Sequence, residues 1–215
     1  MATLSSSDVL IVVDVQHDFL PGGALAVPEG DAVIAPIKAL ARRFAHVVLT
    51  QDWHPASHIS FASSHPGRQP FEAVELHYGT QVLWPDHCIQ GSQGARITDA
   101  LDLPQPELIL RKGYHPHTDS YSAFMEADRR TRTGLAGYLR ERGLERVFCV
   151  GLATDFCVSW TALDAREAGF EAYVIEDACR GIDTGGSMAA AHQAWERAGV
   201  RRVMSSEIEA TAERS

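Results

Sequence analysis

Short, continuously apolar runs recur along the chain and alternate with segments that have the apolar spacing of helices. Because strands without polar alternation are buried on both faces, these runs predict a parallel sheet covered by helices. The predicted strands are residues 9–15, 46–50, 107–111, 147–151, 172–175 and 200–204. The predicted helices are residues 32–44, 133–142, 156–168 and 188–198. We therefore expect a three-layer α/β/α fold, with a mostly parallel central sheet of about six strands.

A long segment interrupts this alternation after the second predicted strand. Residues 52–106 are rich in His, Pro, Gly and Ser and do not continue the rhythm of strands and helices. Loops of this length are uncommon in compact domains unless they carry function. The chain has 215 residues, 45% of them hydrophobic, which is enough for one well-packed core. We expect a single domain over residues 1–215 that contains a functional insertion.

The chain is acidic, with 28 Asp and Glu against 19 Lys and Arg and a formal net charge of -9. Proteins that bind nucleic acid need a basic surface, so this charge argues against a nucleic-acid partner. No apolar run is long enough to span a bilayer, and the first residues do not resemble a secretory signal. The four cysteines form no CxxC motif, which fits a reducing compartment. We expect a cytoplasmic protein without a membrane partner; the sequence leaves a homo-oligomer open.

Polar side chains with catalytic potential follow several of the predicted strands. Asp14 lies near the end of the first strand, Asp52 follows the second and Lys112 follows the third. Cys157 comes after the fourth, a few residues into the next helix. Ligands of open parallel sheets bind at the carboxyl ends of the strands. The sequence therefore predicts that these side chains meet at one edge of the sheet.

Cys157 is predicted to lie in the first turn of a helix, with Thr154 or Asp155 as the N-cap. Free N–H groups and the helix dipole favour a thiolate at that position. The same N–H groups can hold a developing oxyanion. The competing interpretation is a small buried residue that only packs in the core, which is how we interpret Cys149 and Cys179.

Asp14 lies in a strongly apolar strand, where a lone carboxylate is costly to bury. It therefore needs a cationic partner or a raised pKa. Lys112 is the candidate cation. Together with Cys157 they would form a working set, because the carboxylate can take the thiol proton and return it to a leaving amine. A purely structural ion pair between Asp14 and Lys112 is the alternative.

The insertion concentrates histidines behind Asp52. His54, His58 and His65 follow it, and His87 comes later in the same insertion. A carboxylate with two or three imidazoles suits Zn(II), Fe(II) or Mn(II), with water in the open positions. A polar loop with solvated histidines is the competing interpretation.

Several segments, in the same order along the chain, match one enzyme family. They are residues 13–16 with 18–19, 20–25, 50–55, 84–88, 112–113, 119–124 and 151–158. From Val9 through Ser205, the chain resembles the nicotinamidase branch of the isochorismatase-like cysteine hydrolases. The resemblance implies that Asp14, Lys112 and Cys157 form the catalytic triad.

The resemblance also implies the binding residues. Asp52, His54 and His87 match the ligands of one divalent metal ion, with zinc as the first choice and iron or manganese as alternatives. Phe19 and Trp84 match aromatic walls on both sides of a pyridine ring, which fits the stacking preference of flat heterocycles.

One backbone feature of the family falls on Leu152–Ala153, which matches a cis peptide bond that does not involve proline. The N–H groups of Ala153 and Cys157 match the oxyanion hole. The implied reaction is hydrolysis of nicotinamide to nicotinate and ammonia through a cysteine thioester, in NAD salvage. Analogues such as pyrazinamide are further expected ligands.

Other functions remain as alternatives. Related hydrolases that act on carbamoyl amides, ureido compounds or isochorismate keep the triad but generally lack the metal ligands. A nucleotide-binding module is disfavoured because residues 14–19 contain no GxGxxG motif. A metal-binding scaffold without activity would explain the histidines, but not a cysteine at a helix start beside Asp14 and Lys112.

Overall fold

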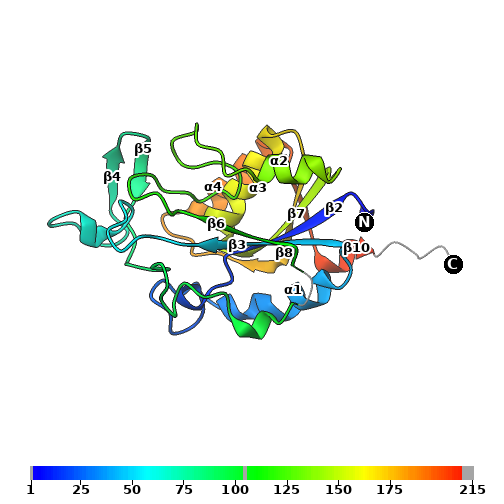
Figure 1. Cartoon of the computed structure of the whole chain (residues 1–215), viewed down its shortest axis with the longest axis horizontal. Helices are drawn as coiled ribbons and strands as arrows, with labels where there is room; N and C mark the ends of the chain where they lie inside the picture. Colours follow the sequence, from blue (N-terminus) through cyan, green and yellow to red (C-terminus); the bar gives the residue numbers. More distant parts are fainter. Residues whose placement is uncertain (1, 104–105, 210–215) are drawn as a thin grey trace.

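A parallel sheet covered by helices forms the centre of the molecule (Figure 1). The computed structural model describes residues 2–103 and 106–209, and within them the central sheet has six strands in the order β6-β3-β2-β7-β8-β9. Each neighbouring pair is parallel. The strands are β2 Asp8–Val13, β3 His46–Asp52, β6 Leu108–Lys112, β7 Arg146–Leu152, β8 Glu171–Arg180 and β9 Arg201–Val203. The predicted sheet is confirmed, because each predicted strand contributes to it.

Helices cover both faces of this sheet (Figure 1). They are α1 Ile34–Ala41, α2 Leu135–Glu141, α3 Ser159–Glu167 and α4 Ser187–Ala198. Leu10 and Val12 of β2 pack in the core beneath α1, whereas Val9, Ile11 and Val13 pack in the core beneath α2, α3 and α4. Each residue from Val9 to Val13 therefore packs in one of the two cores, which explains the unbroken apolar run. None of the helices in the described part of the chain has the length and apolar character needed to cross a bilayer.

The chain changes direction across the sheet at β2. From β2 it continues through β3 to the edge strand β6, and then returns to β7 on the other side of β2. The register places Asp52 beside Lys112 and Val13 beside Gly151. A switch point of this kind opens a crevice at the carboxyl ends of the strands, where ligands of such sheets bind.

The predicted insertion contains a hairpin that was not predicted from the sequence. A hairpin of β4 (Ala73–Leu76) and β5 (Gly79–Val82) extends beyond the end of the sheet (Figure 1). A second small sheet pairs β1 (Ala2–Thr3) with β10 (Ile208–Glu209). Residues 104–105 of the insertion and the two ends of the predicted 1–215 domain lie outside the described residues.

Candidate active site

Residues at the carboxyl ends of neighbouring strands meet in one buried cluster. Asp14 directly follows β2, and Asp52 and Lys112 end β3 and β6. Cys157 comes five residues after the end of β7, and each of these residues is at most 6% exposed. One ligand atom each of Asp14, Asp52 and Cys157 lies within 4.8 Å of the others. The side chains predicted to meet at one edge of the sheet therefore lie close enough to interact.

The ammonium group of Lys112 is the centre of this cluster. Its Nζ lies 2.8 Å from Asp14 Oδ2 and 2.5 Å from Asp52 Oδ1. It also lies 3.3 Å from Cys157 Sγ and donates to the carbonyl oxygen of Ser120 at 3.0 Å. Burial lowers the pKa of Lys112, but the two carboxylates outweigh burial and raise the net pKa well above its usual value. Lys112 therefore stays protonated, and its ammonium group links the Cys157 thiol to both carboxylates.

Thr50 fixes Asp14 at the point where β2 ends. The Thr50 hydroxyl donates to Asp14 Oδ1 at 2.6 Å and accepts the Asp14 N–H at 3.1 Å. These bonds hold Asp14 in a left-handed conformation with φ 49, which is uncommon for residues other than glycine. Burial raises the pKa of Asp14, although Lys112 opposes this effect. Asp14 is therefore a stronger base than an ordinary aspartate.

Cys157 lies in a π-helical turn, Thr154–Val158, directly before α3. The N-cap of this turn is Ala153, and Thr154 and Asp155 lie inside the turn. The prediction that Thr154 or Asp155 is the N-cap is therefore wrong. The physical reason is that the Asp155 carboxylate accepts hydrogen bonds from a distant segment of the chain instead of from its own helix. Single π-helical turns are frequent at functional sites.

The thiol of Cys157 is neutral at rest. Burial raises the pKa of Cys157 well above its usual value; Lys112 opposes this effect and Asp14 adds to it. Before reaction the site therefore holds a neutral thiol beside a base. A helix N-terminus alone would instead favour a preformed thiolate. The peptide bond Leu152–Ala153 is cis, and Ala153 lines the same cavity as Cys157.

Asp52, His54 and His87 form a compact set of potential metal ligands. One ligand atom of each lies within 4.8 Å of the others, and each residue is at most 4% exposed. Asp52 Oδ2 lies 3.5 Å from His54 Nε2 and 3.9 Å from His87 Nε2. Its other carboxylate oxygen contacts Lys112. The donor set is the mixture of imidazole and carboxylate that suits Zn(II), Fe(II) or Mn(II).

The histidine nitrogens that do not face Asp52 are held by backbone oxygens. His54 Nδ1 lies 2.8 Å from the Gly113 carbonyl oxygen, and His87 Nδ1 lies 2.8 Å from the Pro85 carbonyl oxygen. A hydrogen on each Nδ1 leaves the Nε2 lone pair directed at the shared point, as in metal-binding histidines. Burial, assisted by His54, lowers the pKa of His87 to about 4, so this ring is neutral, as a ligand must be. These residues fit a divalent cation.

Gly113 leaves the space that the His54 ring occupies. A Cβ at residue 113 would lie 2.4 Å from His54 Cε1, and the backbone φ is +64. We therefore expect Gly113→Ala to displace the ring and weaken the binding of a divalent metal ion by about tenfold or more. Gly143→Ala is the matched control, because Gly143 has a φ of +66 and nothing within 4 Å of its Cβ position. Zinc titration of both purified variants checks this, and equal affinities would contradict it.

His58 is buried beside His54 but has other partners. The two ring centroids are 4.2 Å apart. His58 Nδ1 lies 2.7 Å from Ser60 Oγ, and Nε2 lies 3.3 Å from the Thr118 carbonyl oxygen. Burial, assisted by His54, lowers the pKa of His58 to about 4. His58 therefore packs as a neutral ring against the ligand set, and His65 bonds to a backbone oxygen elsewhere in the insertion.

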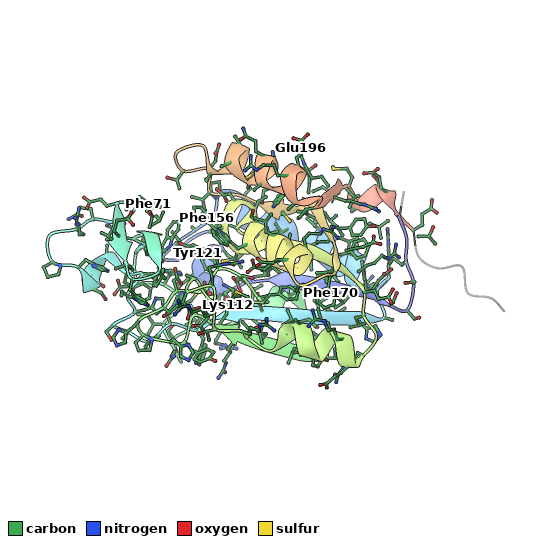
Figure 2. The ribbon with its side chains drawn as sticks, turned by 90° about the horizontal axis from the view of Figure 1, so that it is seen from above. Phe71, Lys112, Tyr121, Phe156, Phe170 and Glu196 are labelled. Carbon is green, nitrogen blue, oxygen red and sulfur yellow. The ribbon has the colours of Figure 1, made fainter. Side chains whose placement is uncertain are left out.

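A small cavity joins the potential metal ligands to the thiol, and aromatic rings form much of its wall. Phe19, Trp84, Tyr121 and Phe156 line it. Trp84 Nε1 donates to the Tyr121 hydroxyl at 2.9 Å, and the Trp84 and Phe156 ring centroids are 4.8 Å apart. Figure 2 shows Tyr121 and Phe156 close to Lys112, near the middle of the molecule. Such walls suit a flat aromatic ligand.

Two buried amide side chains support this cluster, and neither was predicted from the sequence. Gln16 Nε2 donates to the Asp52 carbonyl oxygen at 2.8 Å, and the Asp52 N–H donates to Gln16 Oε1 at 2.8 Å. Gln81 of β5 donates to Asp119 Oδ2 at 2.9 Å and to the Tyr121 hydroxyl at 3.0 Å. A polar residue directly after an apolar strand was the available signal for Gln16; Gln81 stands in a hairpin that had no such signal.

Comparison with known proteins identifies the family. The isochorismatase domain matches residues 8–207. The chain belongs to the isochorismatase family. A curated isochorismatase-family relative, a nicotinamidase from Acinetobacter baylyi, is 59% identical over 199 residues, which cover 93% of each chain.

Solved structures extend this comparison. A nicotinamidase and pyrazinamidase from Acinetobacter baumanii has a TM-score of 0.94 and 58% identity, and the match covers 94% of this chain and 98% of that one. A pyrazinamidase from Pyrococcus horikoshii, solved in complex with zinc, has a TM-score of 0.75 and 38% identity, and the match covers 92% and 99% of the two chains. The resemblance to the nicotinamidase branch of the isochorismatase family is confirmed.

Proposed function

We propose that this protein hydrolyses nicotinamide to nicotinate and ammonia, through a thioester on Cys157, in NAD salvage. The observation that carries the proposal is the contact of one buried ammonium group, that of Lys112, with Cys157, Asp14 and Asp52. This contact joins a nucleophile and its base directly to the potential metal-ligand set. The names of the relatives supply the substrate: they are nicotinamidases and pyrazinamidases.

Asp52, His54 and His87 would hold the metal ion, and we propose zinc. The ligand chemistry supports a borderline cation, and the Pyrococcus horikoshii relative was solved with zinc. When bound, the cation supplies a Lewis acid that orients and polarises the substrate ring. The carbonyl oxygens that hold the Nδ1 atoms of the two histidines keep the rings in place for this task.

The cavity selects a flat aromatic amide. Phe19 and Trp84 hold the pyridine ring from two sides, and Trp84 is fixed by its hydrogen bond to Tyr121. The carboxamide then faces Cys157. Pyrazinamide has the same ring shape and carboxamide position, so we propose that it is a second substrate.

The first half of the reaction acylates the enzyme. Cys157 Sγ attacks the carboxamide carbon while Asp14 takes the thiol proton. The raised pKa of Asp14 makes it a stronger base than an ordinary aspartate, which favours this transfer. Lys112 balances the charge of the two carboxylates and the sulfur throughout. The N–H groups of Ala153 and Cys157 hold the oxyanion.

The second half of the reaction releases both products. The carbon–nitrogen bond breaks, and Asp14 returns its proton to the amine, which leaves as ammonia. A water molecule then attacks the thioester carbonyl while Asp14 accepts a proton from it. The carbon–sulfur bond breaks, Asp14 returns this proton to Cys157, and nicotinic acid leaves; it then ionises to nicotinate, and its proton converts the released ammonia to ammonium.

An ammonia-release assay with a panel of amides tests the proposed function. The panel contains nicotinamide, pyrazinamide, benzamide and a ureido compound, each with zinc-loaded protein. We expect nicotinamide to be turned over with the highest kcat/KM and pyrazinamide to follow it. Turnover of the ureido compound without ammonia from nicotinamide would instead assign the protein to the ureido-hydrolysing relatives that share the triad.

A further inference from the structure

Asp155 is a buried carboxylate two residues before Cys157 that the proposed chemistry does not use. It is 6% exposed. Its Oδ1 accepts the Ile182 N–H at 3.0 Å, and its Oδ2 accepts the Asp183 N–H at 2.8 Å and the Ser187 hydroxyl at 2.5 Å. Hydrogen bonds to an ionised carboxylate are roughly twice as strong as those between neutral groups. The carboxylate is therefore firmly tied to these partners.

The partners of Asp155 belong to the loop between β8 and α4. β8 ends at Arg180 and α4 begins at Ser187. Ile182 of this loop lines the cavity, as does Cys157 of the turn that carries Asp155. The hydrogen bonds of Asp155 therefore join the turn after β7 to the loop after β8. Because both segments line the cavity, these bonds also connect two of its walls.

The loop fits closely around this carboxylate. A Cβ at Gly181 would lie 3.1 Å from Asp155 Oδ1 and 2.4 Å from Met188 Sδ. Asp183 adopts a left-handed conformation with φ 53, and its N–H is one of the groups bonded to Asp155. The loop conformation is therefore matched to the carboxylate at more than one point.

We propose that Asp155 is a positioning residue, which holds the turn carrying Cys157 in place against the cavity wall at Ile182. Its bonded partners are backbone N–H groups and a hydroxyl, so it acts on the reaction through the turn and the loop. A misplacement of about 1 Å in a reacting group can lower a rate on the order of 10²-fold. The carboxylate therefore affects kcat more than KM. This inference rests on the proposed function.

The test is Asp155→Asn, which keeps the size of the side chain. An amide offers only one acceptor oxygen, and its NH₂ group then faces N–H or O–H donors where a carboxylate oxygen accepted them. We expect kcat for nicotinamide to fall by about 10- to 100-fold at temperatures where the variant is folded. KM is expected to change by a smaller factor.

Asp8→Asn is the matched control for general destabilisation. Asp8 is also buried, at 1% exposure, and its carboxylate is bonded to Arg146 at 2.5 Å. It begins β2, whereas the cluster lies at the other end of that strand. We expect this variant to have a lower melting temperature and the kcat and KM of the wild type.

Each outcome decides the inference. A kcat for Asp155→Asn equal to that of the wild type would overturn it, as would an equal loss of kcat in Asp8→Asn. If Asp155→Asn does not fold, Ser187→Ala removes one donor and keeps both backbone donors, so kcat should fall by a smaller factor; an unchanged kcat would overturn the inference. Absence of nicotinamide turnover by the wild type would count against the proposed function instead, and the variants would be compared on the amide that the wild type hydrolyses.

Discussion

Cys157→Ala is expected to lower ammonia release from nicotinamide on the order of 10⁴-fold or more, while the protein still binds the substrate. The loss is large because the residues of a catalytic unit act together. Without the sulfur there is no nucleophile for Asp14 to deprotonate and for Lys112 to stabilise. Binding persists because the aromatic walls and the potential metal ligands are unchanged. Steady-state ammonia release and equilibrium binding of nicotinamide to the zinc-loaded variant measure the two effects separately.

Cys149→Ala is the control for this experiment. Cys149 is a buried thiol in β7 that packs in the core beneath α2, α3 and α4. Its removal deletes one sulfur atom from the interior, which should affect the melting temperature and leave turnover as it is. Turnover by Cys157→Ala at a rate comparable with that of Cys149→Ala would eliminate covalent catalysis.

Loss of His87, one of the proposed metal ligands, is expected to have the second-largest effect. We expect His87→Ala to bind zinc much more weakly and to lower kcat/KM for nicotinamide by about 10²-fold or more, since a metal ion contributes several kcal/mol to charge stabilisation. The variant keeps Asp52, which also contacts Lys112, so the proposed triad of Asp14, Lys112 and Cys157 is expected to stay intact. Metal content by elemental analysis, measured beside activity, separates metal loss from unfolding.

His77→Ala serves as the control for this metal experiment. His77 is an exposed histidine of the same insertion, in the turn between β4 and β5. Its removal should leave zinc content and activity at wild-type levels. The metal assignment would be wrong if chelator-treated, zinc-free wild-type protein hydrolysed nicotinamide at the full rate.

The inner strands β2, β3 and β7 and the first part of β8 were predictable because burial on both faces leaves an unbroken apolar run. The end of β8 was not: the prediction stopped at residue 175, whereas the strand continues to Arg180. Glu176 and Asp177 interrupt the apolar run there, and the pairing with β7 resumes only after a register shift between Cys149 and Gly151. The β4–β5 hairpin was missed because its residues are mostly half-buried or exposed and leave no strong apolar pattern.

The residues of the site were predictable where a reactive side chain lies at the end of a strand or directly after it. Asp14, Asp52 and Lys112 could be found in this way, because parallel strands end at the same edge of the sheet. The support of these residues depends on partners that are distant in sequence: Thr50 bonds Asp14, and Asp155 bonds a loop that begins more than 20 residues later. No local pattern marks such pairs, so the N-cap predicted at Thr154 or Asp155 was wrong, and Ala153 holds that position.

Capture of the acyl group by hydroxylamine during turnover tests the thioester on Cys157 most directly. Hydroxylamine competes with water for an acyl-enzyme, and mass spectrometry then measures nicotinohydroxamate beside nicotinate. We predict that wild type and Cys149→Ala form the hydroxamate at the expense of nicotinate, and that Cys157→Ala forms none. Normal ammonia release that yields nicotinate alone at every hydroxylamine concentration would contradict the thioester.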